Sequence, residues 1–108
     1  MNPVELVLCS LGGCLFICAR MLAEDCGVEL NDLFIELEGD VDLSGCMEGA
    51  KDVEPGFEEV RFTININSNS PEDNIRDLVE LMEIRCPVSD SLQRNIKVNG
   101  NYKTLQKV

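Results

Sequence analysis

The stretch SLGGCLFICAR, residues 10–20, lies at the centre of a long apolar segment and decides how the rest of the chain is arranged. Its apolar residues recur at helical spacing, but two consecutive glycines precede Cys14. Each glycine costs about 1 kcal/mol relative to alanine in a helix interior. The pair therefore indicates that another backbone, another helix or a ligand comes close to the helix beside the Cys14 thiol. Helix packing alone satisfies this requirement without any chemistry.

Around this stretch we predict a helix from Pro3 to about Cys26. Asn2 is a favourable N-cap, proline suits the first turn, and Gly27 favours a stop. Apolar residues cover most of the circumference, as a stripe with two flanks: Val4, Leu8, Leu11, Leu15, Cys18 and Leu22, with Val7, Ile17 and Met21 beside them. This distribution is typical of a central helix that other elements nearly enclose.

Two half-buried strands are predicted next. Leu33–Leu43 and Phe57–Asn67 alternate apolar and polar residues, and the outer face of the first is acidic. The strands are long enough to pair antiparallel. Residues 44–56 between them contain Gly, Ser and Pro and are expected to form a loop.

The last third of the chain predicts a second helix and a short strand. Ser70 is the expected cap of this helix, which ends near Arg85 because Pro87 disfavours helical geometry at the residue before it. Asn95–Lys103 is expected to form a third strand. The order helix, strand, strand, helix, strand predicts an α+β domain with a small antiparallel sheet.

Three strands are too few to cover a helix that is apolar on most sides. A partner chain is the simplest source of the missing cover. We therefore predict an obligate homodimer with the first helix at or near the interface.

Composition limits the classes of partner. The chain has 108 residues, which suits one domain over residues 1–108, and a net charge of −11. This charge repels nucleic acid phosphates and anionic membrane surfaces, so we expect neither as a partner. The acidic excess is expected to form a solvated surface.

Residues 6–19 are uncharged, but this run is shorter than the roughly 20 apolar residues that a helix needs to span a bilayer. Residues 11–14 resemble a lipoprotein cleavage box. However, residues 1–5 contain no Lys or Arg, whereas a secretory signal begins with a positive region. We expect a cytoplasmic protein; export as a lipoprotein cleaved at Cys14 is a hypothesis that N-terminal sequencing decides.

Six cysteines are the most unusual feature of the composition: Cys9, Cys14, Cys18, Cys26, Cys46 and Cys86. Four lie on one predicted helix, a poor arrangement for a disulfide framework and one that fits a reducing compartment. There is no histidine, and no second cysteine pair accompanies Cys14 and Cys18. The spacing therefore predicts no zinc or iron–sulfur site, and we expect no metal and no cofactor.

Cys86 has the clearest local chemistry, in the run RCPVSD at residues 85–90. If a short helix begins at Pro87, Cys86 is its N-cap, where free N–H groups stabilise a thiolate and lower the thiol pKa. Arg85 would add to this effect. The alternative is a plain turn between two helices, and the local sequence favours neither.

Together these motifs resemble the OsmC/Ohr family, whose names refer to osmotic induction and organic hydroperoxide resistance. The resemblance runs from Asn2 to about Val98 and is carried by residues 2–6, the LGGC motif at 11–14, the acidic strand, PGF at 55–57 and RCPVS at 85–89. It implies an OsmC-like fold in an intertwined homodimer that reduces small organic hydroperoxides. It also implies that Cys14 attacks the peroxide, that Cys86 resolves the product as a disulfide, and that an external thiol or dithiol resets the pair.

The family pattern also includes groups that this chain lacks. Hydroperoxide reductases of the family place an arginine beside the attacking thiol, on strands before the central helix, and this chain starts at that helix. The family glutamate ten residues before the cysteine is Val4 here; the adjacent Glu5 is a candidate supporting residue, although it points about 100° away. Four arginines are candidates to substitute, from either chain: Arg20, Arg61, Arg85 and Arg94. The competing hypothesis is a non-catalytic dimeric binding or structural domain with inert buried cysteines.

Overall fold

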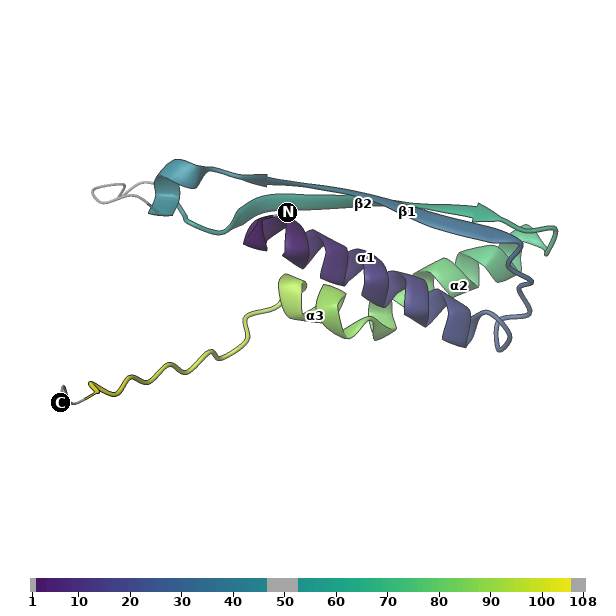
Figure 1. The fold of residues 1–108 in the computed structure, drawn as a ribbon. Coiled ribbons are helices and arrows are strands. Elements are labelled where there is room, and N and C mark those ends of the chain that lie inside the picture. Colours follow the sequence, from purple (N-terminus) through teal and green to yellow (C-terminus); the bar gives the residue numbers. More distant parts are fainter. Residues whose placement is uncertain (1, 47–52, 106–108) are drawn as a thin grey trace.

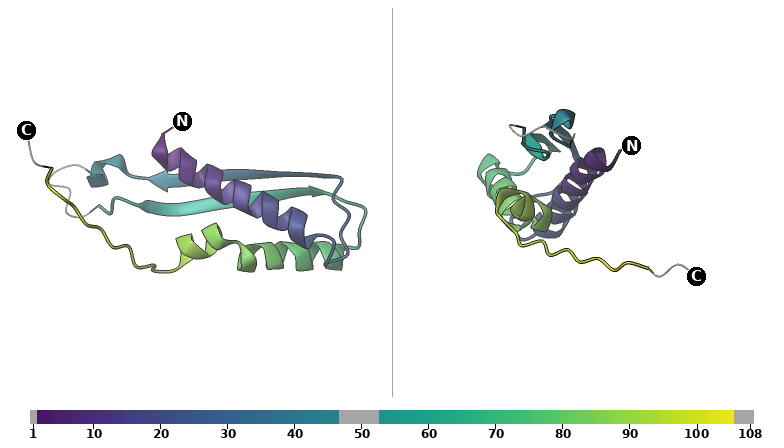
Figure 2. Two further views of the ribbon diagram at one scale, coloured as in Figure 1. Left: turned by 60° about the horizontal axis from the view of Figure 1, so that its bottom comes forward. Right: turned by 90° about the vertical axis from the view of Figure 1, so that its left-hand side faces the viewer.

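The computed structural model describes residues 2–46 and 53–105 (Figure 1). Its elements, in chain order, are α1 (Pro3–Leu22), β1 (Asp32–Val41), the short 3-10 helix η1 (Leu43–Cys46), β2 (Phe57–Asn67), α2 (Glu72–Arg85) and α3 (Pro87–Gln93). The two strands form one antiparallel sheet, and the three helices lie on one side of it (Figures 1 and 2). The α+β class is thus confirmed.

Helix α1 is the central element, since it contacts β1, α2 and α3. It begins as predicted, because the Asn2 side chain accepts a hydrogen bond from the Glu5 N–H at 2.8 Å. It ends at Leu22, before the predicted Cys26. The chain turns there: the Val28 N–H donates to the Ala23 carbonyl at 2.8 Å, and Gly27 has a φ of 70° that favours glycine.

The β1–β2 hairpin separates an apolar face from a charged face. Leu33, Ile35 and Leu37 pair with Ile66, Ile64 and Phe62 and pack on the helices. On the outer face Arg61 binds three carboxylates: Glu38 at 2.9 Å, Asp40 at 2.8 Å and Glu59 at 2.6 Å. The predicted bounds of β2 are confirmed, and β1 is shifted by one or two residues from its predicted bounds.

The stretch between the strands contains η1 at residues 43–46, where a loop was expected. Residues 47–52 of that expected loop lie outside the described residues. Phe57 then follows directly after Gly56 as the first residue of β2.

The start of α2 differs from the prediction. Pro71 occupies the N-cap and provides no side-chain hydrogen bond. Ser70, the expected cap, instead accepts a hydrogen bond from the Glu29 N–H at 2.9 Å. This bond connects the start of α2 to the segment between α1 and β1. The Ser70 hydroxyl therefore makes a tertiary hydrogen bond in place of the helix cap that the local sequence pattern predicts.

The predicted third strand, Asn95–Lys103, is wrong for this chain. Residues 95–105 are exposed and have no strand assignment. The chain leaves α3 and runs away from the sheet as an extended segment (Figure 1). Among the residues that the structure describes, no strand lies beside this segment, so its apolar alternation has no edge with which to pair.

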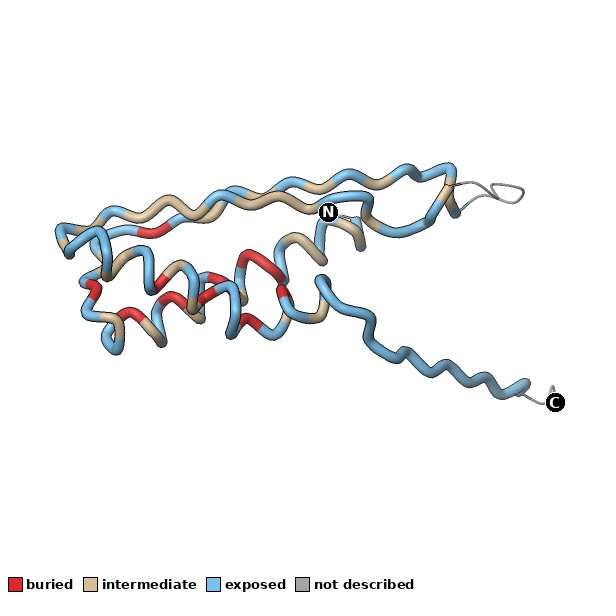
Figure 3. Tube along the Cα trace, turned by 180° about the vertical axis from the view of Figure 1, so that it is seen from behind, coloured by how far each residue is buried: buried red, intermediate tan, exposed pale blue. Residues whose placement is uncertain are grey.

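The core lies between α1, α2 and the inner face of the hairpin (Figure 3). Nine of the described residues are its buried apolar members: Leu11, Leu15, Ala19, Ala23, Val28, Leu33, Leu78, Met82 and Cys86. The expectation that α1 is nearly enclosed is wrong within one chain, since Ile17 is 59% and Met21 72% exposed. The fold thus buries one side of its central helix and leaves the other side open.

Candidate functional site

Two glycines before Cys14 meet different surroundings. A Cβ added at Gly12 would lie 2.7 Å from Cδ1 of Leu37, so this glycine lets β1 approach α1. A Cβ at Gly13 would have no neighbour within 4 Å. The close approach predicted from the sequence is therefore accounted for at Gly12, whereas nothing in the described chain requires Gly13.

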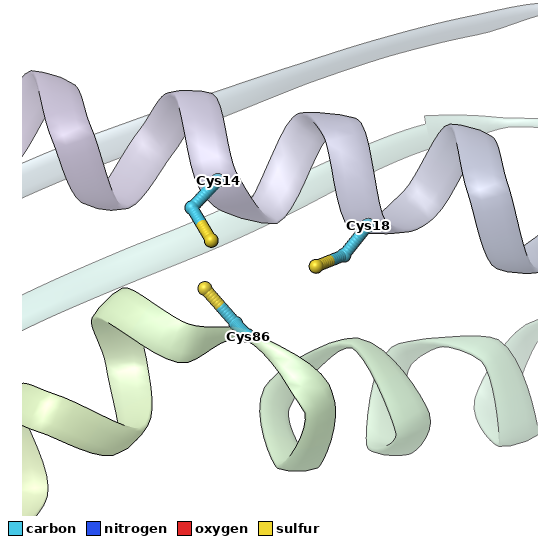
Figure 4. Close-up of side chains that lie close together, drawn as sticks. All are labelled: Cys14, Cys18 and Cys86. Atoms are coloured by element: carbon cyan, nitrogen blue, oxygen red, sulfur yellow. The ribbon is translucent and has the colours of Figure 1, made fainter.

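Cys86 lies at the junction between α2 and α3. Pro87 begins α3, and Cys86 is its N-cap, as the sequence predicted. Its sulfur accepts a hydrogen bond from the Ser89 N–H at 3.5 Å. The side chain is fully buried, and the junction aims it at α1 (Figure 4).

Three thiols converge between α1 and this junction. The sulfurs of Cys14, Cys18 and Cys86 all lie within 4.8 Å of one another (Figure 4). Cys14 and Cys18 are four residues apart and therefore share a face of α1. All three are free thiols. The sequence motifs indicated Cys14 and Cys86 but not Cys18, although its i+4 spacing from Cys14 was a signal that could have indicated it.

The environment of Cys14 favours its thiolate. Burial raises the pKa of the thiol, but hydrogen bonds from the Cys86 thiol, the Val88 N–H and the Cys18 thiol together outweigh burial. The net result is a pKa below the ordinary value. Hydrogen bonds to the charged form thus lower this pKa without an arginine beside the thiol.

Cys86 and Cys18 behave in the opposite way. Burial and the hydrogen bond to Cys14 raise the pKa of Cys86, and the backbone N–H of Ser89 lowers it only in part, so that the pKa is about 11. Burial and the negative charge of Cys14 raise the pKa of Cys18. The N-cap hydrogen bond therefore lowers the pKa of Cys86 as hypothesised, but burial outweighs it, so the net lowering of this pKa is not found. The cluster is built to ionise first at Cys14.

The family model for "OsmC-like protein" matches residues 1–101 of the 108. The chain belongs to the OsmC-like family. The comparison with curated proteins found no match.

Two solved structures show that the OsmC-like fold extends over most of this chain. An OsmC-like protein from Mycoplasma pneumoniae is similar with a TM-score of 0.75 and 22% identity, over 86% of this chain and 62% of that one. An OsmC-like hydroperoxide resistance protein from Jannaschia sp. CCS1 has a TM-score of 0.76 and 19% identity, over 96% and 67% of the two chains. This chain thus spans less than two thirds of the Mycoplasma protein.

The charged residues that were candidates to support Cys14 have other contacts in this OsmC-like chain. Glu5 accepts a hydrogen bond from the Asn2 side chain at 3.3 Å. Arg20 lies over the Phe16 ring, 5.5 Å from its centroid. Arg61 binds the outer carboxylates of the hairpin, and Arg94 binds Asp90 at 2.6 Å. Arg85 is the last residue of α2 and is exposed.

By length and composition alone, α1 is apolar enough to cross a membrane. A core helix of a soluble protein and a signal sequence near the N-terminus share this property, so it is weak evidence. The uncharged run covers only residues 6–19, whereas the helix spans twenty residues. Here α1 packs on β1, α2 and α3 along one side.

Proposed function

We propose that this protein is a thiol peroxidase that reduces small organic hydroperoxides. The observation that carries the proposal is a partly exposed thiol with a lowered pKa, Cys14, whose sulfur lies within 4.8 Å of a second, protonated thiol, Cys86. A nucleophilic thiolate beside a resolving thiol is the arrangement that two-cysteine peroxide reduction requires. Membership of the OsmC-like family supports this function, as does the printed description of the Jannaschia protein.

The chemistry follows from the order of ionisation. The Cys14 thiolate attacks the distal oxygen of the hydroperoxide, the O–O bond breaks, and the alkoxide leaves as an alcohol after taking a proton. Cys14 is then a sulfenic acid. The Cys86 sulfur displaces its hydroxyl, the Cys86 proton leaves with that hydroxyl as water, and a Cys14–Cys86 disulfide forms. An external thiol or dithiol reduces the disulfide and restores both thiols.

A groove of about 800 Å³, which the three cysteines do not line but their neighbours along the chain do, supports an organic substrate. Leu11, one turn before Cys14, and Ser89, in the first turn of α3, both line it. Its other walls combine apolar side chains with carboxylates, among them Phe62, Ile84 and Glu83. Carboxylates repel anions while apolar walls accept alkyl groups, so the groove favours neutral organic hydroperoxides.

We include in the proposal a homodimer in a reducing cytoplasm. The open apolar side of α1 and the exposed residues 95–105 are the surfaces that a second copy would cover. Six cysteines in 108 residues fit a compartment that keeps them reduced.

Stoichiometric oxidation tests the proposal. Reduced protein treated with one equivalent of an alkyl hydroperoxide should lose the mass of two hydrogens, and peptide mapping should assign the loss to Cys14 and Cys86. The Cys14→Ser variant should no longer consume peroxide, while Cys46→Ser, which changes a thiol on η1, should react like the parent. Equal peroxide consumption by the parent and Cys14→Ser would exclude Cys14 as the nucleophile.

The non-catalytic alternative is favoured by one observation, that hydrogen bonds alone support the Cys14 thiolate and no cation contributes to its lowered pKa. Labelling of the folded, reduced protein with a small thiol reagent separates the two functions. A peroxidase should be labelled at Cys14 within minutes at neutral pH, whereas an inert core cysteine would react only after unfolding.

A further inference from the structure

The proposed peroxidase uses two of the three clustered thiols and gives Cys18 no task. Cys18 lies one turn after Cys14 on α1, and its sulfur is within 4.8 Å of both other sulfurs. Three thiols that converge in this way could bind a metal ion together, because each offers one soft sulfur ligand.

The triangle of sulfurs has the size of a metal site. Its sides are at most 4.8 Å, so a point exists that lies no more than about 2.8 Å (the side divided by √3) from every sulfur. Metal–thiolate bonds of this kind are about 2.3 Å long. Small rotations of the side chains therefore suffice to bring all three sulfurs to bonding distance.

The donor atoms select the kind of ion. Within residues 2–46 and 53–105 only these three residues form such a cluster, and the chain has no histidine. Structural zinc almost always takes four protein ligands, whereas thiolate sulfur without oxygen or nitrogen ligands selects soft ions such as Cu(I). We propose that Cys14, Cys18 and Cys86 bind one Cu(I) ion in a three-sulfur site.

The surroundings suit a thiolate-bound ion. The N–H groups of Val88 and Ser89 donate to the sulfurs of Cys14 and Cys86, which offsets part of the negative charge that three thiolates keep around a monovalent ion. Cys14 and Cys18 are partly exposed, so an ion can enter from their side, while the buried Cys86 closes the other side.

Occupation of this site has a consequence for the reaction. A Cys14 sulfur bound to Cu(I) is not available to attack a hydroperoxide, so metal and peroxide exclude each other. Only this consequence rests on the proposed function; the binding itself does not.

Anaerobic competition with bathocuproine disulfonate, a coloured Cu(I) chelator, tests the site. The reference is the triple variant C9S/C26S/C46S, which keeps only the three clustered thiols. It should withdraw one Cu(I) per chain from the chelator, and X-ray absorption at the copper edge should show three sulfur neighbours. Adding Cys18→Ser should weaken Cu(I) binding by about tenfold or more, since even outer-sphere partners of a metal contribute that much.

The substitutions differ in structural risk. Cys86→Ser changes a fully buried residue, so its result counts only if circular dichroism shows a folded protein. Cys18→Ser changes a partly exposed position and keeps the test decisive. Undiminished Cu(I) affinity in the Cys18→Ser variant, or two sulfur neighbours in the reference, would overturn the three-sulfur site. A metal-free, reduced parent that consumes no peroxide but still binds Cu(I) would overturn the peroxidase and leave the site standing.

Discussion

Cys14 depends on the thiol opposite for its reactivity. Its lowered pKa arises because the hydrogen bonds from Cys86, Val88 and Cys18 exceed the effect of burial. Cys86→Ala removes the first of these hydrogen bonds, so the pKa of Cys14 should rise. One pKa unit changes the thiolate fraction about tenfold at neutral pH.

We therefore expect alkylation of Cys14 in the folded Cys86→Ala variant to be slower at pH 7 by about threefold to tenfold. Iodoacetamide labelling followed peptide by peptide measures this change, with rates taken between pH 5 and 10 about every half pH unit. The matched control is Cys46→Ala, which should leave the Cys14 rate unchanged. A faster Cys14 in Cys86→Ala would contradict the assigned hydrogen bond.

The raised pKa of Cys86 also predicts how stability depends on pH. Below about pH 9, Cys86 is protonated in both the folded and the unfolded chain and contributes no pH dependence. Between pH 9 and about 11 the unfolded chain loses this proton while the folded chain keeps it, so the free energy of unfolding should fall.

We expect a loss of about 1–2 kcal/mol over this interval. Urea unfolding at successive pH values measures it. The Cys86→Ala variant, which has nothing to titrate at this position, should lose less over the same interval. An equal loss in the parent and the variant would show that other groups are responsible.

At the scale of elements, the two glycines of α1 should respond differently to alanine. Gly13→Ala gains helix propensity and adds a Cβ with no neighbour within 4 Å. It should raise the free energy of unfolding by up to about 1 kcal/mol. Gly12→Ala gains the same propensity but pushes its Cβ against Leu37, so its net gain should be smaller.

Chemical denaturation of both variants beside the parent measures this difference. Because the two positions are adjacent on one helix, each variant is the control for the other. If Gly13→Ala destabilises the protein, a surface outside the described chain packs against Gly13.

The elements also show what local patterns could predict. The hairpin and the helix that begins at Pro87 follow from alternation and from proline chemistry, and both are present. Ser70 was misassigned because its hydroxyl binds Glu29, forty-one residues away in sequence. The pKa values of Cys14 and Cys86 depend on burial and on the contact between the two thiols. Neither can be predicted from the spacing of residues along the chain. Cys18 belongs to the site because Cys86 lies opposite α1, and this tertiary contact could not be predicted from the sequence.

The whole molecule is more extended than its length requires. Its radius of gyration is 18.5 Å, against about 13 Å for a compact chain of this length. Its accessible surface is 8529 Å², against about 6000 Å² for a compact protein of this mass. Part of the excess comes from residues 95–105, where Val98 and Tyr102 are more than 80% exposed. These dimensions favour assembly with a second copy.

We expect the protein to be a homodimer in solution and truncation after Arg94 to weaken the dimer. Residues 95–105 are extended and carry alternating apolar side chains, so in the dimer they should pair with an open sheet edge of the partner. Light scattering after gel filtration, over a concentration series, measures the mass. The control is Lys103→Ala, which removes a charge from this segment without shortening it. A truncated chain that dimerises as tightly as the parent would contradict this pairing.

Cys14 and Cys86 are neighbours in space but belong to opposite ends of the chain. A disulfide between them would close a loop that includes the second half of α1, the hairpin and α2. Closing a loop of this length removes unfolded-state entropy worth about 4 kcal/mol. We therefore expect one equivalent of alkyl hydroperoxide to raise the melting temperature of the parent but not of Cys86→Ala, as scanning calorimetry can measure. In each catalytic cycle the disulfide would form and be reduced again, so the stability of the fold would rise and fall with it. At high peroxide concentration the oxidised form would accumulate, and the protein would resist unfolding and proteolysis more strongly.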